Sequence, residues 1–252
     1  MSIVERVAAF VYGIGVLFGA TASGLVIGTL GVLPFAVVPR GRRERLAMPA
    51  AALWARTVLG LLAVRFHVRG RVDLRPGEGA LIVCNHRSWV DPVALMAATR
   101  SNGLSKNEIF WLPVIGLYGW LAGAVFFDRR DPRGRERARR EVMDLAMSGH
   151  RIQVFPEGTR SRDGRLKEQV YLRLLMDCYS RGVAIVPCAI VGSEDALPAH
   201  RLGAWPFKDV TLEIGAVRRP QEFTSAAAYA RACWEDVRGL VTSLHDASLA
   251  DR

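Results

Sequence analysis

The sequence has little cysteine and very little lysine, and it has no charged residue between Val7 and Pro39. Its four cysteines show no paired spacing for zinc or for a redox motif, so we expect buried free thiols in a reducing compartment. Most of the histidines also lack a carboxylate or cysteine at ligand spacing, so we expect structural roles for them and propose no metal site. These histidines are His67, His150, His200 and His245.

The charge that is present is strongly basic. The net charge is +10, and the 34 basic residues are nearly all arginine. An excess of this kind attracts either nucleic acid or an anionic membrane surface. We see no nucleic-acid-binding module and no interleaving of aromatic with basic residues, so we expect no nucleic-acid partner. Four arginines adjoin the apolar segment, where each contributes about 1 kcal/mol of attraction to anionic lipid head groups. They are Arg40, Arg42, Arg43 and Arg45.

The uncharged segment from Val7 to Pro39 is long enough to enter a membrane. As one straight helix it would measure about 50 Å at ~1.5 Å per residue, against a hydrocarbon core of roughly 30 Å. Because it contains several glycines and Pro34, we expect a tilted span or a broken, partly re-entrant helix. The arginines that follow favour the cytoplasmic (inner) membrane, with the rest of the chain facing the cytoplasm. A signal peptide ending near Ala20 is the alternative, although its basic region is weak.

The remainder of the chain alternates short apolar runs with helical patterns. This alternation predicts an α/β fold with a mixed, largely parallel sheet flanked by helices, after an N-terminal membrane-associated helical segment. We expect an anchoring region at residues 1–63 and an α/β domain at 64–252. The predicted strands are Val64–Val72, Ala80–Cys84, Ala124–Phe127, Arg151–Phe155, Val183–Ile190 and Val210–Ile214. The predicted helices are Pro92–Arg100, Glu108–Tyr118, Arg135–Met147, Glu168–Ser180 and Ser225–Leu249.

A histidine and a carboxylate, His86 and Asp91, lie five positions apart directly after the predicted strand Ala80–Cys84. Histidine can accept a proton near neutral pH, and a nearby carboxylate can orient its ring and stabilise the imidazolium. The pair supplies a base but no nucleophile, which suggests that the attacking group belongs to a substrate. The same residues also fit a helix cap, with Asp91 at the N-cap and Pro92 at the first helical position.

A second polar motif, Phe155 to Ser161, follows the strand predicted at Arg151–Phe155. It contains glycine and proline together with Glu157, Thr159 and Arg160, and the arginine side chain is a planar fork suited to phosphate or carboxylate. A polar turn in which Glu157 pairs with Arg160 would explain the same residues without a ligand.

Together the two motifs resemble the lysophosphatidic acid acyltransferase family, which transfers a fatty acyl group from a thioester to a glycerol hydroxyl. The family's first block, Asn-His, four residues and Asp, is met by Asn85, His86 and Asp91, and its third block by Phe155 to Ser161. The second block is visible at Ser105, Lys106, Pro113, Gly116 and Phe126–Arg129, and the fourth at Val186–Ile190. The family often has an N-terminal helical pair, and Ala47 to Val64 could supply its second helix.

The resemblance implies a role for each candidate residue. His86 would be the general base and Asp91 its orienting carboxylate. Arg129 and Arg160 would hold the acceptor phosphate, supported by Lys106, Gly158 and Thr159, while Glu157 would fix the loop or receive the glycerol hydroxyls. The donor would be acyl-CoA or acyl carrier protein, the acceptor 1-acyl-glycerol-3-phosphate and the product phosphatidic acid, with no cofactor.

Two alternatives remain beside this activity. The family usually shows a Phe-Lys-x-Gly-like stretch after the third block, but this chain has Leu166–Val170 with neither phenylalanine nor glycine. Because of this departure, a different acceptor substrate remains an alternative, such as another lysophospholipid or a lyso-aminolipid. A membrane-anchored protein that binds lipid without turnover is the other alternative, although it would not need both His86 and Asp91.

Overall fold

The computed structural model describes residues 2–112, 114–128, 130–161, 166–199 and 203–250. Its strands form one sheet with the order β1-β7-β6-β2-β5-β3-β4. Strand β7 is antiparallel to β6 and parallel to β1, and every other neighbouring pair is parallel. The predicted fold class is therefore confirmed. The strands are β1 Arg65–Arg69, β2 Ala80–Cys84, β3 Asn102–Lys106, β4 Val125–Phe127, β5 Arg151–Val154, β6 Ala184–Val191 and β7 Asp209–Ile214.

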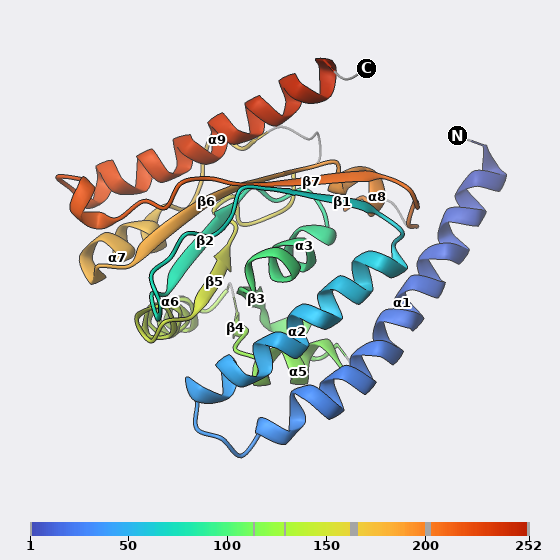
Figure 1. Ribbon diagram of the computed structural model, residues 1–252, viewed down its shortest axis with the longest axis horizontal. Helices are drawn as coiled ribbons and strands as arrows, with labels where there is room; N and C mark the ends of the chain where they lie inside the picture. The colour runs from blue at the N-terminus through green and yellow to red at the C-terminus, as the bar shows by residue number, and fades with distance from the viewer. Residues whose placement is uncertain (1, 113, 129, 162–165, 200–202, 251–252) are drawn as a thin grey trace.

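Helices cover both faces of this sheet (Figure 1). The short helices η1 (Leu33–Phe35), α4 (Asn107–Phe110), α8 (Ser193–Ala196) and η2 (Pro220–Glu222) lie in connections. The longer helices are α1 Ile3–Gly31, α2 Arg42–Leu61, α3 Val90–Thr99, α5 Ile115–Leu121, α6 Pro132–Met147, α7 Arg173–Arg181 and α9 Ala226–Ala250.

Strand β2 shows how the sheet divides the core into two layers. All five of its residues are buried, and successive side chains point to opposite faces. Ile82 packs in the cluster that contains residues of α2 and α3, whereas Leu81 packs in the cluster that contains residues of α6, α7 and α9. An apolar run buried on both faces is typical of a central parallel strand. All four cysteines are buried without disulfides, as predicted, and burial raises the pKa of the Cys84 thiol.

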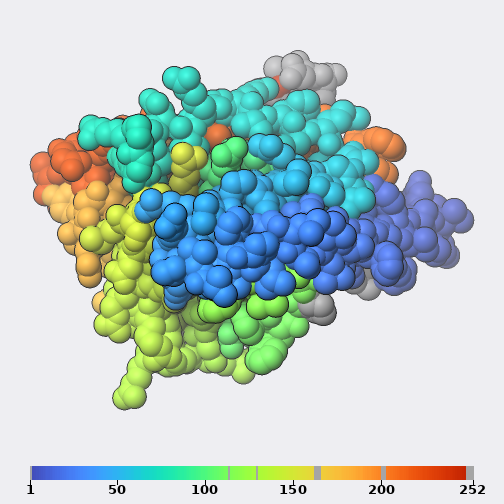
Figure 2. All heavy atoms as spheres, turned by 60° about the horizontal axis from the view of Figure 1, so that its bottom comes forward, coloured from blue at the N-terminus to red at the C-terminus, as the bar shows by residue number. Residues whose placement is uncertain are grey.

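The apolar segment is one continuous helix, α1, as far as Gly31, and the α-helix ends there, with the 3-10 helix η1 following at Pro34. The glycines inside α1 do not break it. Glycine allows close packing here, since a Cβ at Gly28 would lie 2.4 Å from the Tyr118 ring. Much of the rest of α1 is exposed, for example Leu17 at 64% and Phe18 at 75%. Figure 2 shows α1 and α2 lying side by side across one face, with the first residues of α1 extending past the body. Within the described ranges, α1 together with η1 is the one helical segment long and apolar enough to cross a membrane.

The four arginines that follow the apolar segment were all expected to attract lipid head groups, but one of them, Arg43, is buried. Arg43 is 5% exposed, pairs with Glu44 at 3.1 Å, and has its guanidinium 4.8 Å from the centre of the Trp120 ring. A desolvated cation over an indole contributes roughly 2 kcal/mol of attraction. Arg43 therefore fastens α2 to α5 and is not available to lipid head groups.

Three elements differ from their predictions. Strand β3 was missed, because Asn102–Lys106 has only one large apolar residue. The helix predicted at Glu108–Tyr118 is divided into α4 and α5, and Val114 between them has φ 71°. The helix predicted from Glu168 begins at Arg173, because the preceding residues turn back and the Tyr171 amide donates to the Pro156 carbonyl at 2.8 Å.

Candidate active site

The two polar motifs meet at the carboxyl ends of β2 and β5, which are neighbouring parallel strands. Their register pairs Val83 with Val154, so the loops that follow leave the sheet side by side. Ligands of open α/β sheets commonly bind outside the carboxyl ends of the strands. The Ser161 amide donates to the His86 carbonyl at 2.9 Å and closes the two loops against each other.

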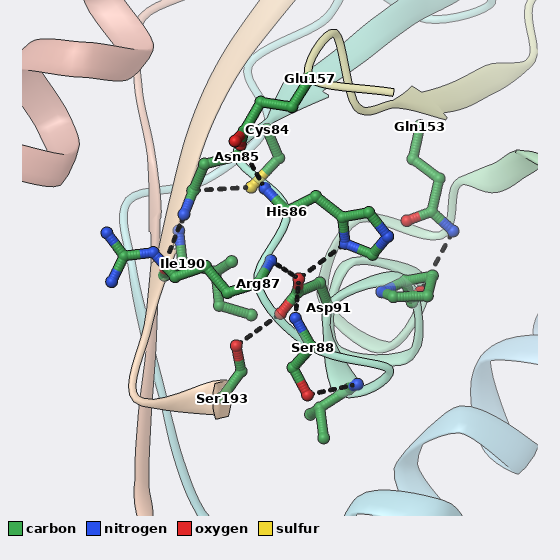
Figure 3. A network of polar contacts seen from close by, with 12 residues as sticks. Cys84, Asn85, His86, Arg87, Ser88, Asp91, Gln153, Glu157, Ile190 and Ser193 are labelled. Carbon is green, nitrogen blue, oxygen red and sulfur yellow. Dashed lines mark hydrogen bonds and ion pairs between the residues drawn. The ribbon is translucent and has the colours of Figure 1, made fainter. Parts of the chain in front are cut away.

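His86 and Asp91 form a close pair (Figure 3). The distance from His86 Nδ1 to Asp91 Oδ2 is 2.8 Å. An ionised carboxylate only accepts hydrogen bonds, so the neutral ring in this geometry has its proton on Nδ1 and a lone pair on Nε2. Figure 3 shows Nε2 pointing away from Asp91. The His86 side chain is 18% exposed while Asp91 is fully buried, so the ring can meet a substrate and its partner cannot.

Asp91 is held by three further donors. Its Oδ2 accepts from the Arg87 amide at 2.5 Å and the Ser88 amide at 2.7 Å, and its Oδ1 accepts from Ser193 Oγ at 2.5 Å. Hydrogen bonds to a charged acceptor are the strong ones, so these contacts hold the carboxylate firmly in place. The alternative of Asp91 as N-cap is wrong in position, because α3 begins at Val90 and Asp91 accepts amides from the residues that precede the helix.

The second loop fixes His86 from the other side. The Phe155 ring stacks on the imidazole with centroids 4.1 Å apart and an interplanar angle of 21°. Glu157 Oε1 accepts from the His86 backbone amide at 2.8 Å. Burial raises the pKa of the Glu157 carboxyl, which is 2% exposed, while the His86 amide partly counteracts this effect. Of the two roles considered for Glu157, this contact fits the one that fixes the loop.

The remaining polar residues of the motif each have a contact of their own. The Arg160 guanidinium lies 3.6 Å from the centre of the Trp89 ring. Lys167 Nζ donates to the Glu157 carbonyl at 3.2 Å and also contacts Thr159 Oγ1. Gly158 has φ 69°, a left-handed conformation that favours glycine. Two cations, Arg160 and Lys167, therefore lie on the segment after β5, near His86. Thr159 is the residue that Lys167 contacts.

The other two predicted phosphate ligands are Lys106 and Arg129. Lys106 is exposed at the end of β3, and it forms no hydrogen bond or ion pair with His86 or Asp91 within the described ranges. Arg129 lies outside the residues that the structure describes.

An apolar cavity of about 260 Å³ adjoins the pair. It approaches the site at Trp89, Pro92 and Gln153, where Gln153 Nε2 donates to the Pro92 carbonyl at 3.1 Å. From there it runs between the N-terminal helices and α3, α5 and β4. Its large lining side chains are Trp54, Trp89, Met96, Ile115, Tyr118 and Phe126.

Two positioning contacts could not be found from the motifs. Ser193, which bonds Asp91, lies at the start of α8 just after the fourth block and has no sequence signal beyond that neighbourhood. Asn85 was recognised as part of the first block, but its contacts were not foreseen. Its side chain donates to the Ile190 carbonyl and accepts from the Ile190 amide, both at 2.8 Å, and so ties the loop to β6.

Comparison with known proteins agrees with this geometry. A family model described as Acyltransferase matches residues 65–191. The 1-acyl-sn-glycerol-3-phosphate acyltransferase LPAT1 of Arabidopsis thaliana is 30% identical over 201 residues, covering 79% of this chain and 56% of that protein. The lyso-ornithine lipid O-acyltransferase of Rhodobacter capsulatus is 38% identical over 109 residues, covering 43% of this chain and 38% of that protein.

A solved structure shares the fold. The 1-acyl-sn-glycerophosphate acyltransferase PlsC from Thermotoga maritima superposes with a TM-score of 0.79 over 93% of this chain and 95% of that chain, at 22% identity. The chain belongs to the acyltransferase family, and the resemblance drawn from its motifs is confirmed. It spans little more than half of the length of the Arabidopsis relative.

Proposed function

We propose that this chain transfers a fatty acyl group from a thioester, acyl-CoA or acyl carrier protein, to the free hydroxyl of 1-acyl-glycerol-3-phosphate. The observation that carries the proposal is the His86–Asp91 pair, in which the carboxylate holds Nδ1 of the ring while Trp89 and Pro92, close to Asp91 in the chain, line an apolar cavity. A protein that only bound lipid would not need a buried carboxylate that three other donors hold against one histidine.

The proposed reaction transfers the acyl group directly and needs no acyl-enzyme intermediate. The acceptor oxygen attacks the thioester carbonyl carbon while its proton passes to His86 Nε2. The resulting imidazolium is stabilised by Asp91. When the tetrahedral intermediate collapses, the C–S bond breaks and the departing thiolate takes the proton from Nε2. General base catalysis of this kind contributes roughly 10²–10⁴-fold, and positioning of the two substrates supplies much of the rest.

The apolar cavity is suited to an acyl chain. Its lining is aromatic and aliphatic, and each buried methylene of a chain contributes about 0.8 kcal/mol. Because the cavity reaches the site at Trp89 and Pro92, a chain placed in it would bring its carboxyl end towards His86.

The acceptor phosphate would meet Arg160, with Lys167 beside it. The Arg160 guanidinium lies over the Trp89 ring, and a planar fork of this kind suits two parallel hydrogen bonds to a phosphate. The roles assigned to Arg129 and Lys106 stay predictions.

We place the protein at the inner membrane with its sheet domain in the cytoplasm. The exposed apolar surface of α1 and the arginines at 40 and 42 support this assignment, since the positive flank faces the cytoplasm. The full-length chain should resist extraction by alkaline carbonate, and recovery of the intact chain in the soluble fraction would contradict membrane attachment.

A lyso-aminolipid is the second candidate acceptor. The lyso-ornithine lipid O-acyltransferase shows 38% identity over the stretch that it matches, above the 30% of the Arabidopsis relative over a longer stretch. The changed sequence from Leu166 to Val170 lies directly beside the loop that would hold the acceptor head group.

The test is a mass-spectrometric assay of purified full-length protein with one acyl-CoA and a panel of acceptors. The panel contains lysophosphatidic acid, lysophosphatidylcholine and lyso-ornithine lipid, and each is also tested with the acyl carrier protein thioester. The proposal expects phosphatidic acid as the main product. Preferential formation of ornithine lipid would establish the second candidate, and no product with any acceptor would leave only lipid binding.

A further inference from the structure

A second cavity, polar and about 370 Å³ in volume, lies at the other end of the sheet from His86. His86 follows the carboxyl end of β2, whereas this cavity is formed around the first residues of β5 and the last residues of α3. We call it the basic cavity. Its charged and polar lining residues are Glu44, Arg45, Arg100, Asn102, His150 and Arg151.

Three arginines give the basic cavity its positive charge. Arg45 donates to the Ser148 carbonyl at 2.5 Å and Arg151 to the Thr99 carbonyl at 2.9 Å. In the part of the chain that the structure describes, neither they nor Arg100 form an ion pair with a carboxylate. Burial, and after it the charge of Arg100, lowers the pKa of Arg151.

The one carboxylate among the described lining residues does not neutralise them. Glu44 is 1% exposed, and its Oε1 lies 3.1 Å from Arg43 Nη2 and 3.5 Å from Arg40 Nε. Its Oε2 accepts from the Gly41 amide. Because these partners lie outside the cavity lining, the charge of Glu44 is already compensated, and the cations that face the cavity remain in excess.

A buried histidine adds a polar atom that has no partner. His150 is 8% exposed, and its Nε2 has no hydrogen-bond partner among the described residues. An unsatisfied buried polar atom is destabilising, and a ligand that bonds to it can recover this cost. Burial lowers the pKa of His150, with Arg45 acting in the same direction and Glu44 and the Gly41 carbonyl opposing it.

We propose that the basic cavity binds a phosphate group, presented either as a lipid head group or as a free phosphate ion. Arg100 and Arg151 can offer planar forks, Arg45 a third cation, and His150 Nε2 a fourth contact after its ring takes up a proton. Arg45 lies in the first turn of α2, directly after the apolar helix and its short connection, so a membrane head group is within reach of the cavity. The site is distinct from the catalytic cluster because it lies at the opposite end of β5 and α3.

The resonance of His150 Nε2 reports on this site alone. Full-length protein with ¹⁵N-labelled histidine is placed in nanodiscs of neutral phosphatidylcholine, and the resonance is assigned by its loss in His150→Gln. One arm adds inorganic phosphate, and the other replaces the lipid by equimolar phosphatidylcholine and phosphatidic acid. Sodium chloride at matched ionic strength is the control for screening.

The expected result is a saturable shift of the His150 resonance in at least one arm. A shift with inorganic phosphate assigns a free phosphate site, and a shift with phosphatidic acid alone assigns a lipid head-group site. Arg45→Gln combined with Arg100→Gln should weaken the response at least tenfold, whereas Arg42→Gln, exposed on the same helix turn and outside the lining, should respond as the wild type. No shift in either arm, an equal shift with sodium chloride, or an equal loss in Arg42→Gln would overturn the proposal.

Discussion

Among the described residues, His86–Asp91 and His67–Asp209 are histidine–aspartate pairs with similar distances, but their surroundings differ. His86 lies 2.8 Å from Asp91, whose carboxylate is buried and accepts from two backbone amides and a serine. His67 lies 3.1 Å from Asp209, but both side chains are more than half exposed. Arg65 also binds Asp209 through two hydrogen bonds, and this contact lowers the pKa of the Asp209 carboxyl.

The contrast shows that a short histidine–carboxylate distance does not define a site. Asp209 is shared with an arginine in water, so the field it applies to His67 is screened and its geometry is loosely held. Asp91 is fully buried and accepts from two backbone amides of its own loop and from Ser193 of α8, and its neighbours Trp89 and Pro92 line the apolar cavity. Burial of the carboxylate and the number of donors that hold it separate a candidate catalytic pair from a surface ion pair.

The largest expected difference between the two pairs appears when the histidine ring is removed. His86→Ala should reduce acyl transfer to lysophosphatidic acid by roughly 10²–10⁴-fold, because the general base is lost. His67→Ala, which removes a ring that also contacts an aspartate, should keep turnover within a factor of two. Initial rates measured by mass spectrometry on both variants check this. Retention of more than a tenth of wild-type turnover in His86→Ala would disprove the assignment.

The next largest effect is expected at the two carboxylates. Asp91→Asn should lower kcat by at least about 10²-fold, because the neutral amide no longer stabilises the imidazolium. It should also lower the free energy of unfolding by roughly 2 kcal/mol, since charge-assisted hydrogen bonds are lost at a buried site. Asp209→Asn should change neither quantity appreciably. Kinetics and chemical denaturation of the two variants test the comparison, which fails if both lose activity to the same extent.

An arginine lies near each pair, Arg160 near His86 and Arg65 near His67. Exchanging each arginine for lysine should affect activity only at the first pair. Arg160→Lys should lower kcat/KM for lysophosphatidic acid at least tenfold, equivalent to about 1.4 kcal/mol of transition-state binding, because the planar fork is lost. Hydrolysis of the thioester by water, which needs no acceptor phosphate, should change little. Arg65→Lys should alter neither rate. Equal losses of both reactions in Arg160→Lys would indicate a structural role for Arg160.

The smallest effect is expected at Ser193, which holds only one oxygen of Asp91. Ser193→Ala should reduce kcat less than tenfold and leave KM unchanged, because three donors to Asp91 remain and substrate contacts are not altered. Ser193→Thr, which keeps the hydroxyl, should recover part of the loss. A change confined to KM would contradict a role that acts through Asp91.

Sequence reasoning succeeded where a local pattern carries the information. Ala80–Cys84 was predicted to the residue, because an uninterrupted apolar run after a glycine is typical of a buried parallel strand. The two motif loops were expected to serve one reaction because together they match the first and third blocks of the family. The glycines inside α1 suggested a broken helix, but Gly28 serves close packing against Tyr118 of α5, and Gly19 against Leu61 of α2.

Contacts between distant segments could not be predicted in this way. Strand β3 is polar in sequence and is held as a strand by its pairing with β4 and β5. The bond from Ser193 to Asp91 joins residues 102 positions apart, and nothing near either residue specifies it. The partner of His67 was also unforeseen, because Asp209 reaches it only through the pairing of β1 with β7. Each of these contacts depends on the assembled sheet.

The central claim is that Asp91 acts on the reaction through His86, and a double-mutant cycle tests it most directly. The rates of His86→Ala, Asp91→Asn and the double variant are measured with lysophosphatidic acid and one acyl-CoA, normalised to the folded fraction of each. Once the ring is gone the carboxylate has no base to orient, so the double variant should be no slower than His86→Ala within a factor of two. A rate in the double variant equal to the product of the two single losses would show that the residues act independently, and would contradict the account.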